Sequence, residues 1–386
     1  MRVTFIGCPF RTSYGHYIDS LRQAIQLHYG DHVDWVASNC GCGDPVERER
    51  RFETQPTAYF EMPHVSAYES RTRWKRRLRR SARSLSYHAR SNRYIRLAAG
   101  SDVMHLQQTL NAYGAMVAFH WLKRRTSAAK VITVHELDAH QTQFVHQNTL
   151  YNHADALIVH SSDLRERLLE YGVRAEKVHV LPYGAELSAD IGERERTGIV
   201  FYGGHHLMSG KGLDTVFRAA ALLREKLGAR APRITIHGHY GTETPTEALK
   251  LAEEFGVTDQ LIWLNQIDEA EIGPLYRAAQ LAVLPYTGGA AGLPACTAAA
   301  NALPVIATRR AGIPDQLGED AVWIAENNPQ QLAAEIARLL ADRSARDALA
   351  RRALERATQT LSWPVVAGRT VGIYREALRV RAAPNS

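Results

Sequence analysis

Short apolar runs that alternate with helical patterns constrain this chain more than any other feature. Six such runs lie in its first half, at Val3–Ile6, Val33–Val36, Val103–Leu106, Val131–Val134, Ala156–Val159 and Val178–Leu181. Strands that are apolar along their whole length are typical of parallel sheets covered by helices on both faces. Helical patterns lie between these runs, at His16–Leu27, Ala112–Arg124 and Ser162–Tyr171. The pattern predicts a doubly wound α/β domain.

A second series of the same kind fills the rest of the chain. Its apolar runs are Ile199–Tyr202, Ile234–His237, Leu261–Leu264, Leu281–Leu284, Val305–Ala307 and Ala321–Ile324. Helical patterns end the sequence, at Pro329–Ala341, Ser344–Thr358 and Trp363–Arg379. Between the two series, Ser188–Thr197 is polar and charged and has no apolar period, which is typical of a linker. We expect two doubly wound domains facing a cleft, with ligands beyond the C-terminal ends of the strands.

The stretch from Leu281 to Thr308 predicts a ligand-binding loop. It reads as a buried strand, a glycine-rich loop with Gly288 and Gly289, a short Ala-rich helix with Pro294 in its first turn, and a second buried strand. The free N–H groups at the start of such a helix favour a phosphate. A tight turn in an ordinary α/β sheet is the alternative reading.

Composition excludes several classes of protein. A length of 386 residues suggests two domains, and 45% apolar with 23% charged residues describes a globular chain. No run approaches the roughly 18 apolar residues of a membrane span, and the apolar run after Met1 is too short for a signal peptide. Four cysteines form no disulfide or zinc pattern, so we expect a cytoplasmic protein.

The net charge of +7 is concentrated in one segment. Eleven Lys or Arg residues lie between Arg71 and Arg96, interleaved with Trp74 and Leu78. Three readings stay open: a solvated face, an anionic membrane surface that the segment binds peripherally, and nucleic acid. Nucleic acid is the least favoured, because no recognised nucleic-acid module accompanies the segment.

Nine short motifs, taken in order, resemble the retaining glycosyltransferases of family 4, the group 1 type. They are Thr133–Glu136, Ala154–Ser161, Lys177–Gly184, Gly210–Asp214, Ile236–Gly238, Leu275–Tyr276, Gly292–Ala295, Leu303–Thr308 and Leu361–Pro364. The resemblance covers nearly the whole chain and implies the GT-B architecture, two Rossmann-like domains facing a cleft.

The resemblance also implies the domain boundaries. Residues 1–187 would form the N-terminal acceptor-side domain and residues 188–197 the linker. Residues 198–362 would bind the nucleotide-sugar. Residues 363–386 would form a C-terminal helix that returns to the N-terminal domain, followed by a tail.

Such a protein moves a sugar from a nucleoside-diphosphate sugar to a hydroxyl of a glycan, a glycolipid or a natural product. Negative charge develops on the leaving diphosphate, so the site needs cations and oriented N–H groups, and no metal or other cofactor is expected. Lys211, between two glycines after a strand, matches the phosphate-binding lysine of the family. The family usually has an arginine five residues earlier, where this chain has His206, a weaker or pH-sensitive clamp. A surface lysine at a turn is the alternative for Lys211.

Further site residues follow from the same resemblance. His135 matches the sugar-facing histidine, and a buried structural histidine is the alternative. Gly15 matches the first-domain glycine loop, with Arg11 and His16 as candidate acceptor or phosphate contacts. The donor-binding motifs add the positions Gly238, Gly292 and Leu293.

One departure affects the predicted function more than the fold. The family carries two glutamates eight positions apart, one for the donor sugar and one for the ribose hydroxyls. The matching residues are Gly289 and Thr297, and neither is a carboxylate. A carboxylate that accepts a ribose hydroxyl contributes about 1.5–3 kcal/mol, and Thr297 makes at most one weaker bond.

Two hypotheses from different classes therefore stay open, an active transferase with a divergent donor pocket and a catalytically inactive relative that acts as a nucleotide-sugar-binding or scaffold partner. A sugar-nucleotide epimerase is a third hypothesis, although the sequence offers no acidic residues to act as its acid/base pair. A nicotinamide-dependent dehydrogenase is disfavoured, because no Gly-x-Gly-x-x-Gly follows the first strand.

Overall fold

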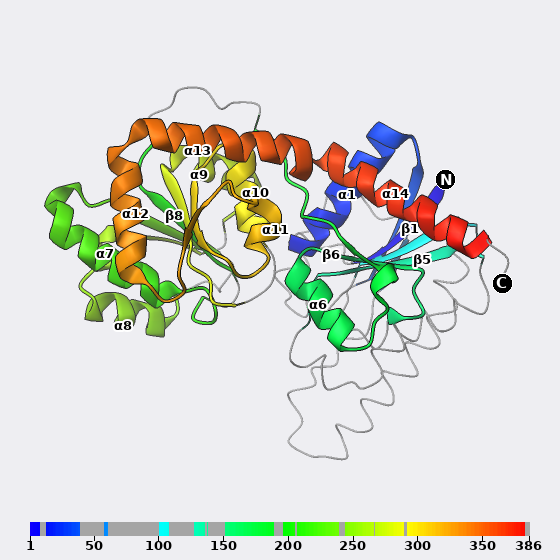
Figure 1. Cartoon of the computed structure of the whole chain (residues 1–386), viewed down its shortest axis with the longest axis horizontal. Helices are drawn as coiled ribbons and strands as arrows, with labels where there is room; N and C mark the ends of the chain where they lie inside the picture. Colours follow the sequence, from blue (N-terminus) through cyan, green and yellow to red (C-terminus); the bar gives the residue numbers. More distant parts are fainter. Residues whose placement is uncertain are drawn as a thin grey trace, which may run out of the picture. The chain divides into compact units, whose positions relative to one another are not determined.

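The chain folds into two compact units, shown in Figure 1. The computed structural model describes residues 1–7, 13–38, 58–60, 100–107, 127–135, 137, 151–188, 196–204, 207–238, 244–265, 267–288 and 292–382. The first unit comprises Met1–Leu181 together with Val366–Ser386, and the second comprises Pro182–Val365. The first unit is therefore built from two pieces of chain that lie far apart in the sequence.

A seven-stranded sheet forms the centre of the first unit. Its spatial order is β3-β2-β1-β4-β5-β6-β7, and every neighbouring pair is parallel. The strands are β1 (Arg2–Gly7), β2 (His32–Ser38), β3 (Ala58–Phe60), β4 (Val103–Gln107), β5 (Ala129–Val134), β6 (Ala156–Val159) and β7 (Val178–Val180). Each residue of β4, β5 and β6 is buried, as expected for strands covered on both faces.

The described helices of the first unit flank this sheet. They are α1 (Ser13–Tyr29), α6 (Ser162–Glu170), the 3-10 turn Ala175–Lys177 and the part of α14 (Trp363–Ala382) that follows Val366. Helix α14 runs beside α1 (Figure 1), where Gly368 lies against the Tyr29 side chain, closely enough that a Cβ at Gly368 would be 2.1 Å from the Tyr29 hydroxyl. The last helix thus completes the packing of the first unit.

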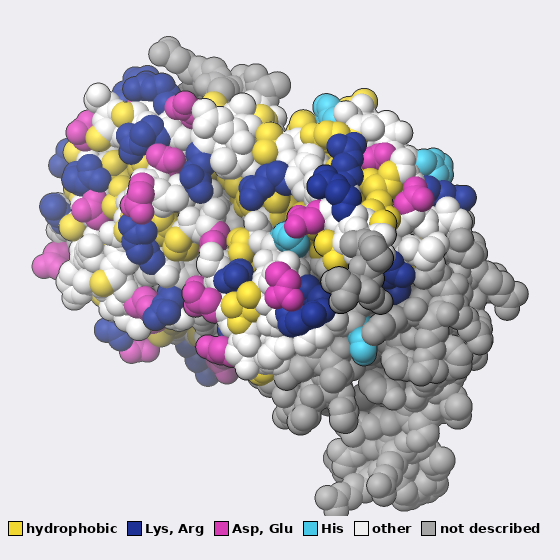
Figure 2. Space-filling view, turned by 45° about the vertical axis from the view of Figure 1, so that its right-hand side comes forward, with side chains coloured by type: hydrophobic (Ala, Val, Ile, Leu, Met, Phe, Trp, Pro, Cys, Tyr) yellow, Lys and Arg dark blue, Asp and Glu magenta, His cyan; other side chains and the backbone are white. Residues whose placement is uncertain are grey.

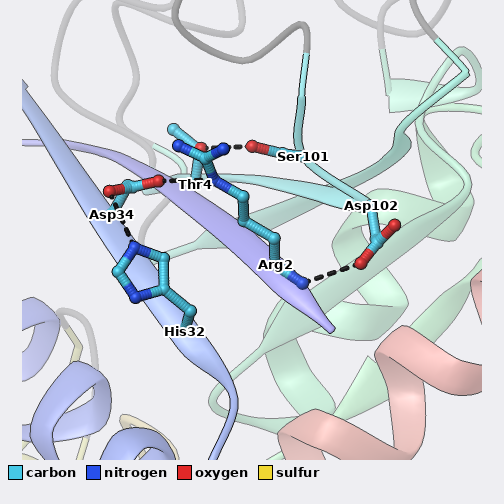
Figure 3. Close-up of polar contacts among 6 residues, drawn as sticks. All are labelled: Arg2, Thr4, His32, Asp34, Ser101 and Asp102. Carbon is cyan, nitrogen blue, oxygen red and sulfur yellow. Dashed lines mark hydrogen bonds and ion pairs between the residues drawn. The ribbon is translucent and has the colours of Figure 1, made fainter.

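Polar contacts align the amino ends of the central strands in the first unit (Figure 3). The backbone N–H of Arg2 donates to the Asp102 carboxylate at 2.7 Å, and its Nε donates to Asp34 at 2.9 Å. The buried Thr4 and Ser101 hydroxyls, drawn in the same view, are 2.5 Å apart. The exposed ion pair contributes at most about 1 kcal/mol, so these contacts align the strands more than they stabilise them. The amino edge is therefore structural.

A six-stranded parallel sheet forms the second unit, in the order β10-β9-β8-β11-β12-β13. Its strands are β8 (Ile199–Gly204), β9 (Ile234–Gly238), β10 (Leu261–Asn265), β11 (Leu281–Leu284), β12 (Val305–Thr308) and β13 (Val322–Ile324). In both sheets the order reverses direction beside the first strand, between β1 and β4 and between β8 and β11. Ligands of doubly wound sheets bind at such a reversal, beyond the carboxyl ends of the strands.

Capping side chains begin several helices of the second unit. Asn328 and Asp342 accept hydrogen bonds from the backbone N–H groups of Gln331 and Ala345, at 2.9 Å each. Asp268 and Glu271 form a capping box before α9. The helices of this unit are α7 (Leu213–Leu227), α8 (Thr246–Glu254), α9 (Glu269–Ala278), α10 (Leu293–Ala300), α11 (Ile313–Leu317), α12 (Pro329–Ala341) and α13 (Arg343–Arg356), with 3-10 turns at Gly228–Arg230 and Thr258–Gln260 and a π turn at Ala357–Leu361.

Two segments that enter and leave the second unit lie side by side. Ala185 pairs with Ser362 in a parallel bridge, and its N–H donates to the Leu361 carbonyl at 2.8 Å. A Cβ at Gly184 would be 2.3 Å from the indole ring of Trp363, so only glycine fits there. Two motifs that are 177 residues apart in sequence, counted from Ala185 to Ser362, therefore contact each other.

The structure confirms the predicted fold class of two doubly wound α/β domains. Each apolar run chosen from the sequence is a strand, and Ala156–Val159 and Leu281–Leu284 have the predicted bounds. Strand β3 was not predicted. The boundary between the units lies at Leu181 and Pro182, ahead of the segment expected to be a linker. That segment begins and ends inside the second unit, where Ser188 and Thr197 donate to backbone carbonyls of Ala300 and Ala278 at 3.0 and 2.8 Å.

Charged side chains of both signs are interspersed on the visible face of the described residues, as Figure 2 shows. Several form exposed ion pairs, such as Arg309 with Glu319 at 2.8 Å. The basic segment from Arg71 to Arg96 and the helix predicted at 112–124 lie outside the described residues, so the membrane-surface reading stays a prediction. Within the described part of the chain, no helix combines the length and apolar character needed to span a membrane.

Candidate functional site

The turn between β8 and α7 is shaped by glycines. Gly210 and Gly212 have φ angles of +69° and +71°, in the left-handed region that favours glycine. A Cβ at Gly212 would lie 2.1 Å from the Pro285 carbonyl oxygen, and one at Gly210 would lie 3.2 Å from the Gly288 carbonyl carbon. The Gly210 carbonyl in turn accepts hydrogen bonds from the N–H groups of Thr287 and Gly288, at 3.0 and 3.1 Å. The loops that follow β8 and β11 are therefore locked together at the point where the sheet order reverses.

Lys211 lies in this turn, between the two glycines. Its ammonium is 4.2 Å from the centre of the Tyr286 ring, a cation–π distance. Its side chain crosses Gly204, where a Cβ would be 3.5 Å from Cε and 3.9 Å from Nζ. Helix α7 begins directly after Gly212, and among the described residues no side chain caps its first N–H groups, which lie beside Lys211. The predicted phosphate-binding lysine thus lies at the N-terminus of a 15-residue helix, an arrangement suited to an anion.

Tyr286 is the buried support beneath Lys211. Its hydroxyl donates to the Tyr202 carbonyl at 2.6 Å, and its own carbonyl accepts from the Thr308 hydroxyl at 2.5 Å. Burial raises the pKa of Tyr286 well above its usual range, so the phenol stays protonated and the ring stays neutral. Tyr286 was not predicted, because a tyrosine after a strand has no distinguishing pattern.

Gly238 ends β9 and lies opposite Gly204 in the sheet register. The neighbouring His237 ring contacts Tyr202, with ring centroids 5.0 Å apart, and its Nε2 lies 3.0 Å from the Tyr276 hydroxyl. Two facing glycines and a cluster of aromatic rings therefore form the carboxyl edge of β8 and β9.

Helix α10 presents one partly exposed face. Gly292 begins the helix and is buried; a Cβ there would lie 2.3 Å from Cγ of Gln316. Leu293 and Thr297 are half-buried, whereas the other residues of the helix are buried. The Thr297 hydroxyl donates to the Leu293 carbonyl at 3.0 Å, which leaves its oxygen as an acceptor. The residue at the position of the family's ribose-binding glutamate thus lies on the accessible face.

Gln316, which the sequence did not predict as a site residue, connects α10 to the start of the second unit. Its Oε1 accepts from the Cys296 thiol at 3.0 Å and from the Tyr183 backbone N–H at 3.1 Å. Arg356 Nε donates to the Gln316 carbonyl at 2.6 Å. The glycine cap of α10 is therefore fixed by a buried side chain from α11.

In the first unit, His135 follows β5 at the carboxyl edge of the sheet. It is 2% exposed, its Nε2 lies 3.1 Å from Oε1 of Gln107, and its Nδ1 lies 3.1 Å from Nε2 of His160. Burial, reinforced by the nearby histidines, holds the pKa of His135 well below its usual range. The predicted sugar-facing histidine is thus neutral, at the predicted edge and inside a hydrogen-bonded cluster.

The remaining predicted site residues fall in two groups. Helix α1 begins at Ser13, so Gly15 lies in its first turn and the half-buried His16 follows in the same turn. Arg11, His206 and Gly289 lie outside the described residues. Among the described residues, no group of three or more His, Cys, Asp or Glu side chains is placed to hold a metal ion.

Two sheets, each in doubly wound order, define the GT-B class of glycosyltransferase fold. Sucrose-phosphate synthase from Thermosynechococcus elongatus superposes with a TM-score of 0.75 at 19% identity, covering 98% of this chain and 100% of that one. HepE from Anabaena, solved in complex with UDP, gives a TM-score of 0.71 at 14% identity and covers 97% of this chain and 100% of its own. At such identities the likeness concerns the fold.

Family comparisons are more specific. The model described as Glycosyltransferase Family 4 matches residues 20–189, and the model described as Glycosyl transferases group 1 matches residues 185–356. The chain belongs to this family, the family 4 glycosyltransferases of group 1 type.

Curated relatives match part of the chain. D-inositol 3-phosphate glycosyltransferase from Nocardiopsis dassonvillei is 29% identical over 257 residues, which is 62% of this chain and 59% of that protein. MMP alpha-(1->4)-mannosyltransferase from Mycolicibacterium hassiacum is 28% identical over 234 residues, 59% of this chain and 56% of its own length. The chain thus spans somewhat more than half the length of each relative.

Proposed function

We propose that this protein is a retaining glycosyltransferase that moves a sugar from a nucleoside-diphosphate sugar to a hydroxyl of an acceptor. The observation that carries the proposal is Lys211 at the glycine turn before α7. In the reaction, the bond from the anomeric carbon to the diphosphate oxygen breaks, a bond to the acceptor oxygen forms, and the proton of the acceptor hydroxyl passes to the departing diphosphate. The Lys211 ammonium and the first N–H groups of α7 would stabilise the charge that develops on the diphosphate, without a metal.

The α10 face receives the nucleotide in this proposal. Thr297 offers one hydroxyl oxygen to a ribose hydroxyl, a bond that contributes about 1 kcal/mol, where the family's carboxylate would contribute more. Leu293 supplies an apolar neighbour. The relatives whose names specify glycosyl transfer, and a structural neighbour solved with UDP, support a nucleotide-sugar donor and place uridine nucleotides first in a screen.

One observation favours the second candidate function, an inactive relative that binds a nucleotide-sugar. Helix α10 has no acidic residue in its first turn, and no Asp or Glu occurs anywhere in it. The two candidates share the anion site and differ in turnover, so binding and transfer must be measured separately.

A thermal-shift screen tests the shared site. UDP, GDP, ADP, CDP, dTDP and their sugars are each added to the full chain, and a bound ligand should raise the melting temperature. Calorimetry with the best nucleotide should then show a loss of about tenfold or more in affinity for Lys211→Ala, since a charge-assisted bond contributes about 1.5–3 kcal/mol. Lys226→Ala, which removes an exposed lysine at the other end of α7, is the matched control.

The outcomes separate the hypotheses. Unchanged affinity in Lys211→Ala contradicts the proposed site. Affinity that depends on Lys211, with release of nucleoside diphosphate from the matching donor in the presence of acceptor, supports the transferase. The same affinity without any release from the donors and hydroxyl acceptors tested favours the inactive relative.

A further inference from the structure

A chain of buried polar side chains crosses the carboxyl edge of the first sheet. Adjacent strands contribute its members: His105 and Gln107 from β4, Thr133 and His135 from β5 and its end, and His160 directly after β6. Each of the five is at most 2% exposed. Because a buried polar group without a partner is costly, the hydrogen bonds of such a chain determine where its protons lie.

This series of hydrogen bonds ends at a backbone carbonyl, which can only accept a hydrogen bond. His160 Nδ1 lies 2.9 Å from the Leu181 carbonyl oxygen, and the Leu181 N–H is itself bonded to the Val159 carbonyl at 2.8 Å. The carbonyl is therefore held in place by the backbone and has no proton to give. His160 Nδ1 must carry the proton of that bond.

Burial then fixes the other nitrogen of His160. It lowers the pKa of His160 to about 4 and holds that of His135 well below its usual range, so both rings are neutral at pH 7. With its one proton on Nδ1, His160 presents a lone pair from Nε2, which lies 3.1 Å from His135 Nδ1. His135 must therefore donate from Nδ1, and its Nε2 is left with a lone pair.

If the hydrogen bonds ran in the opposite direction, the lone pair of His160 Nδ1 would face the lone pair of the Leu181 carbonyl oxygen. At the Gln107 end the carboxamide oxygen lies 3.1 Å from His135 Nε2, and its NH2 group lies 3.3 Å from His105 Nε2. A half-turn of the carboxamide exchanges the two groups and brings the NH2 group to His135, whereas the Leu181 carbonyl cannot turn. The Leu181 carbonyl therefore sets the direction of the hydrogen bonds.

We infer that His160 is a positioning residue that holds His135 as the tautomer protonated on Nδ1, so that Nε2 presents a lone pair. The inference deepens the proposed function and rests on it in one respect: a substrate hydroxyl bound at His135 would donate its hydrogen bond to Nε2, taking the place of the Gln107 amide. Tyr17 packs edge-on against both rings, with centroids 5.1 Å and 5.0 Å away, and keeps their planes fixed. The Leu181 carbonyl, acting through His160, would therefore make His135 Nε2 accept a hydrogen bond from a substrate hydroxyl rather than donate one.

Nitrogen NMR tests the tautomer without any substrate. The full chain is labelled with [15N]histidine, and long-range 1H–15N correlations distinguish a protonated from an unprotonated ring nitrogen. The His135 signals are assigned by their loss in His135→Gln. We expect a protonated Nδ1 and an unprotonated Nε2 in the unmodified chain; a proton on Nε2 there overturns the inference whether or not the protein transfers sugar.

Two variants of the anchor test the cause. His160→Phe keeps the ring but removes the acceptor, so His135 should shift toward the tautomer protonated on Nε2, bonded to the Gln107 oxygen. His160→Gln places a carboxamide at the same depth and should restore the original tautomer. With the best donor, sugar transfer should fall about tenfold in His160→Phe, the loss expected when one hydrogen bond is misdirected, and recover in His160→Gln. If His160→Phe is folded and keeps the proton on Nδ1, the inference fails; if it does not fold, the tautomers of the unmodified chain and of His160→Gln decide.

Discussion

In both units the candidate site lies at the carboxyl edge of a parallel sheet, but the two edges are built from different groups. In the first unit the edge consists of buried side chains that hydrogen-bond one another, with three neutral histidines among them. In the second unit it consists of backbone shaped by glycines, with Lys211 as the charged side chain in the turn. A backbone site depends on φ angles and close approach, whereas a side-chain cluster depends on protonation. The units should therefore fail under different perturbations.

Acid should produce the largest difference between them. Burial lowers the pKa of His105 to about 3 and of His160 to about 4, from an ordinary 6.5. The unfolded chain binds these protons first, so this stability is complete above pH 6.5 and is lost as the pH falls toward 4. We expect the first unit to lose on the order of 5 kcal/mol between pH 7 and pH 4, since one unit of pKa corresponds to about 1.4 kcal/mol.

Hydrogen exchange, corrected for its intrinsic pH dependence, measures the two units separately. Amides of β5 should lose protection on acidification well before those of β12. His160→Gln should flatten the dependence in β5, and His28→Gln, at an exposed histidine of α1, should leave it unchanged. Equal loss of protection in both strands would contradict the expected difference in acid sensitivity between the two units.

A substitution in the backbone site should have the next largest effect. Gly212→Ala combines a left-handed φ of +71° with a Cβ 2.1 Å from a carbonyl oxygen, and we expect a loss of about 3 kcal/mol in unfolding free energy and of the nucleotide response. Gly256→Ala is the matched control, because Gly256 has a φ of +62° but no atom within 4 Å of the added Cβ. It should lose about 1 kcal/mol. Urea unfolding and calorimetry measure both; similar losses in the two variants would show that close packing at the turn contributes nothing.

The smallest effect should follow from restoring a carboxylate. Thr297 is half-buried beside Leu293, so Thr297→Glu should change the unfolding free energy by less than about 1 kcal/mol. If the ribose lies on this face, nucleotide affinity should rise about tenfold, because a charge-assisted bond replaces a neutral one. Thr297→Gln has a similar length without the charge and should gain little. A large loss of stability in Thr297→Glu, or weaker binding, would show that this face holds a different ligand.

Much of the fold follows from the sequence, because parallel strands that are buried on both faces are apolar throughout. Leu281–Leu284 was predicted at its observed bounds for that reason, and Pro329–Ala341 was predicted at its observed bounds from its helical pattern. Strand β3 was missed because its three residues, Ala58–Phe60, include no β-branched aliphatic residue, whereas the equally short β7 and β13 contain Val or Ile. The helix predicted to run from Ser344 to Thr358 ends earlier, at Arg356, and continues as a π turn to Leu361 before Ser362 pairs with Ala185.

The candidate site was predicted where the backbone imposes a residue type. Lys211 was predicted from the resemblance of its Gly-Lys-Gly segment to the family motif, and both of these glycines have positive φ angles. Tyr286 and Gln316 were missed, because aromatic and amide residues at such positions are common and their partners are distant in sequence. The link from His135 to Gln107 and His160 spans 28 and 25 residues along the chain and arises only when three strands align.

The discontinuity of the first unit has a consequence for synthesis on the ribosome. The Tyr374 hydroxyl lies 2.5 Å from Nδ1 of His105, a contact across 269 residues, and Val371 and Ile373 of the same helix are buried. The N-terminal unit therefore emerges first but lacks one wall until the last helix has been translated. The second unit, continuous from Pro182 to Val365, has all of its own residues before that helix appears. A chain truncated before residue 366 thus has every residue of the second unit but lacks the last helix of the first, so the unit that is begun first is completed last.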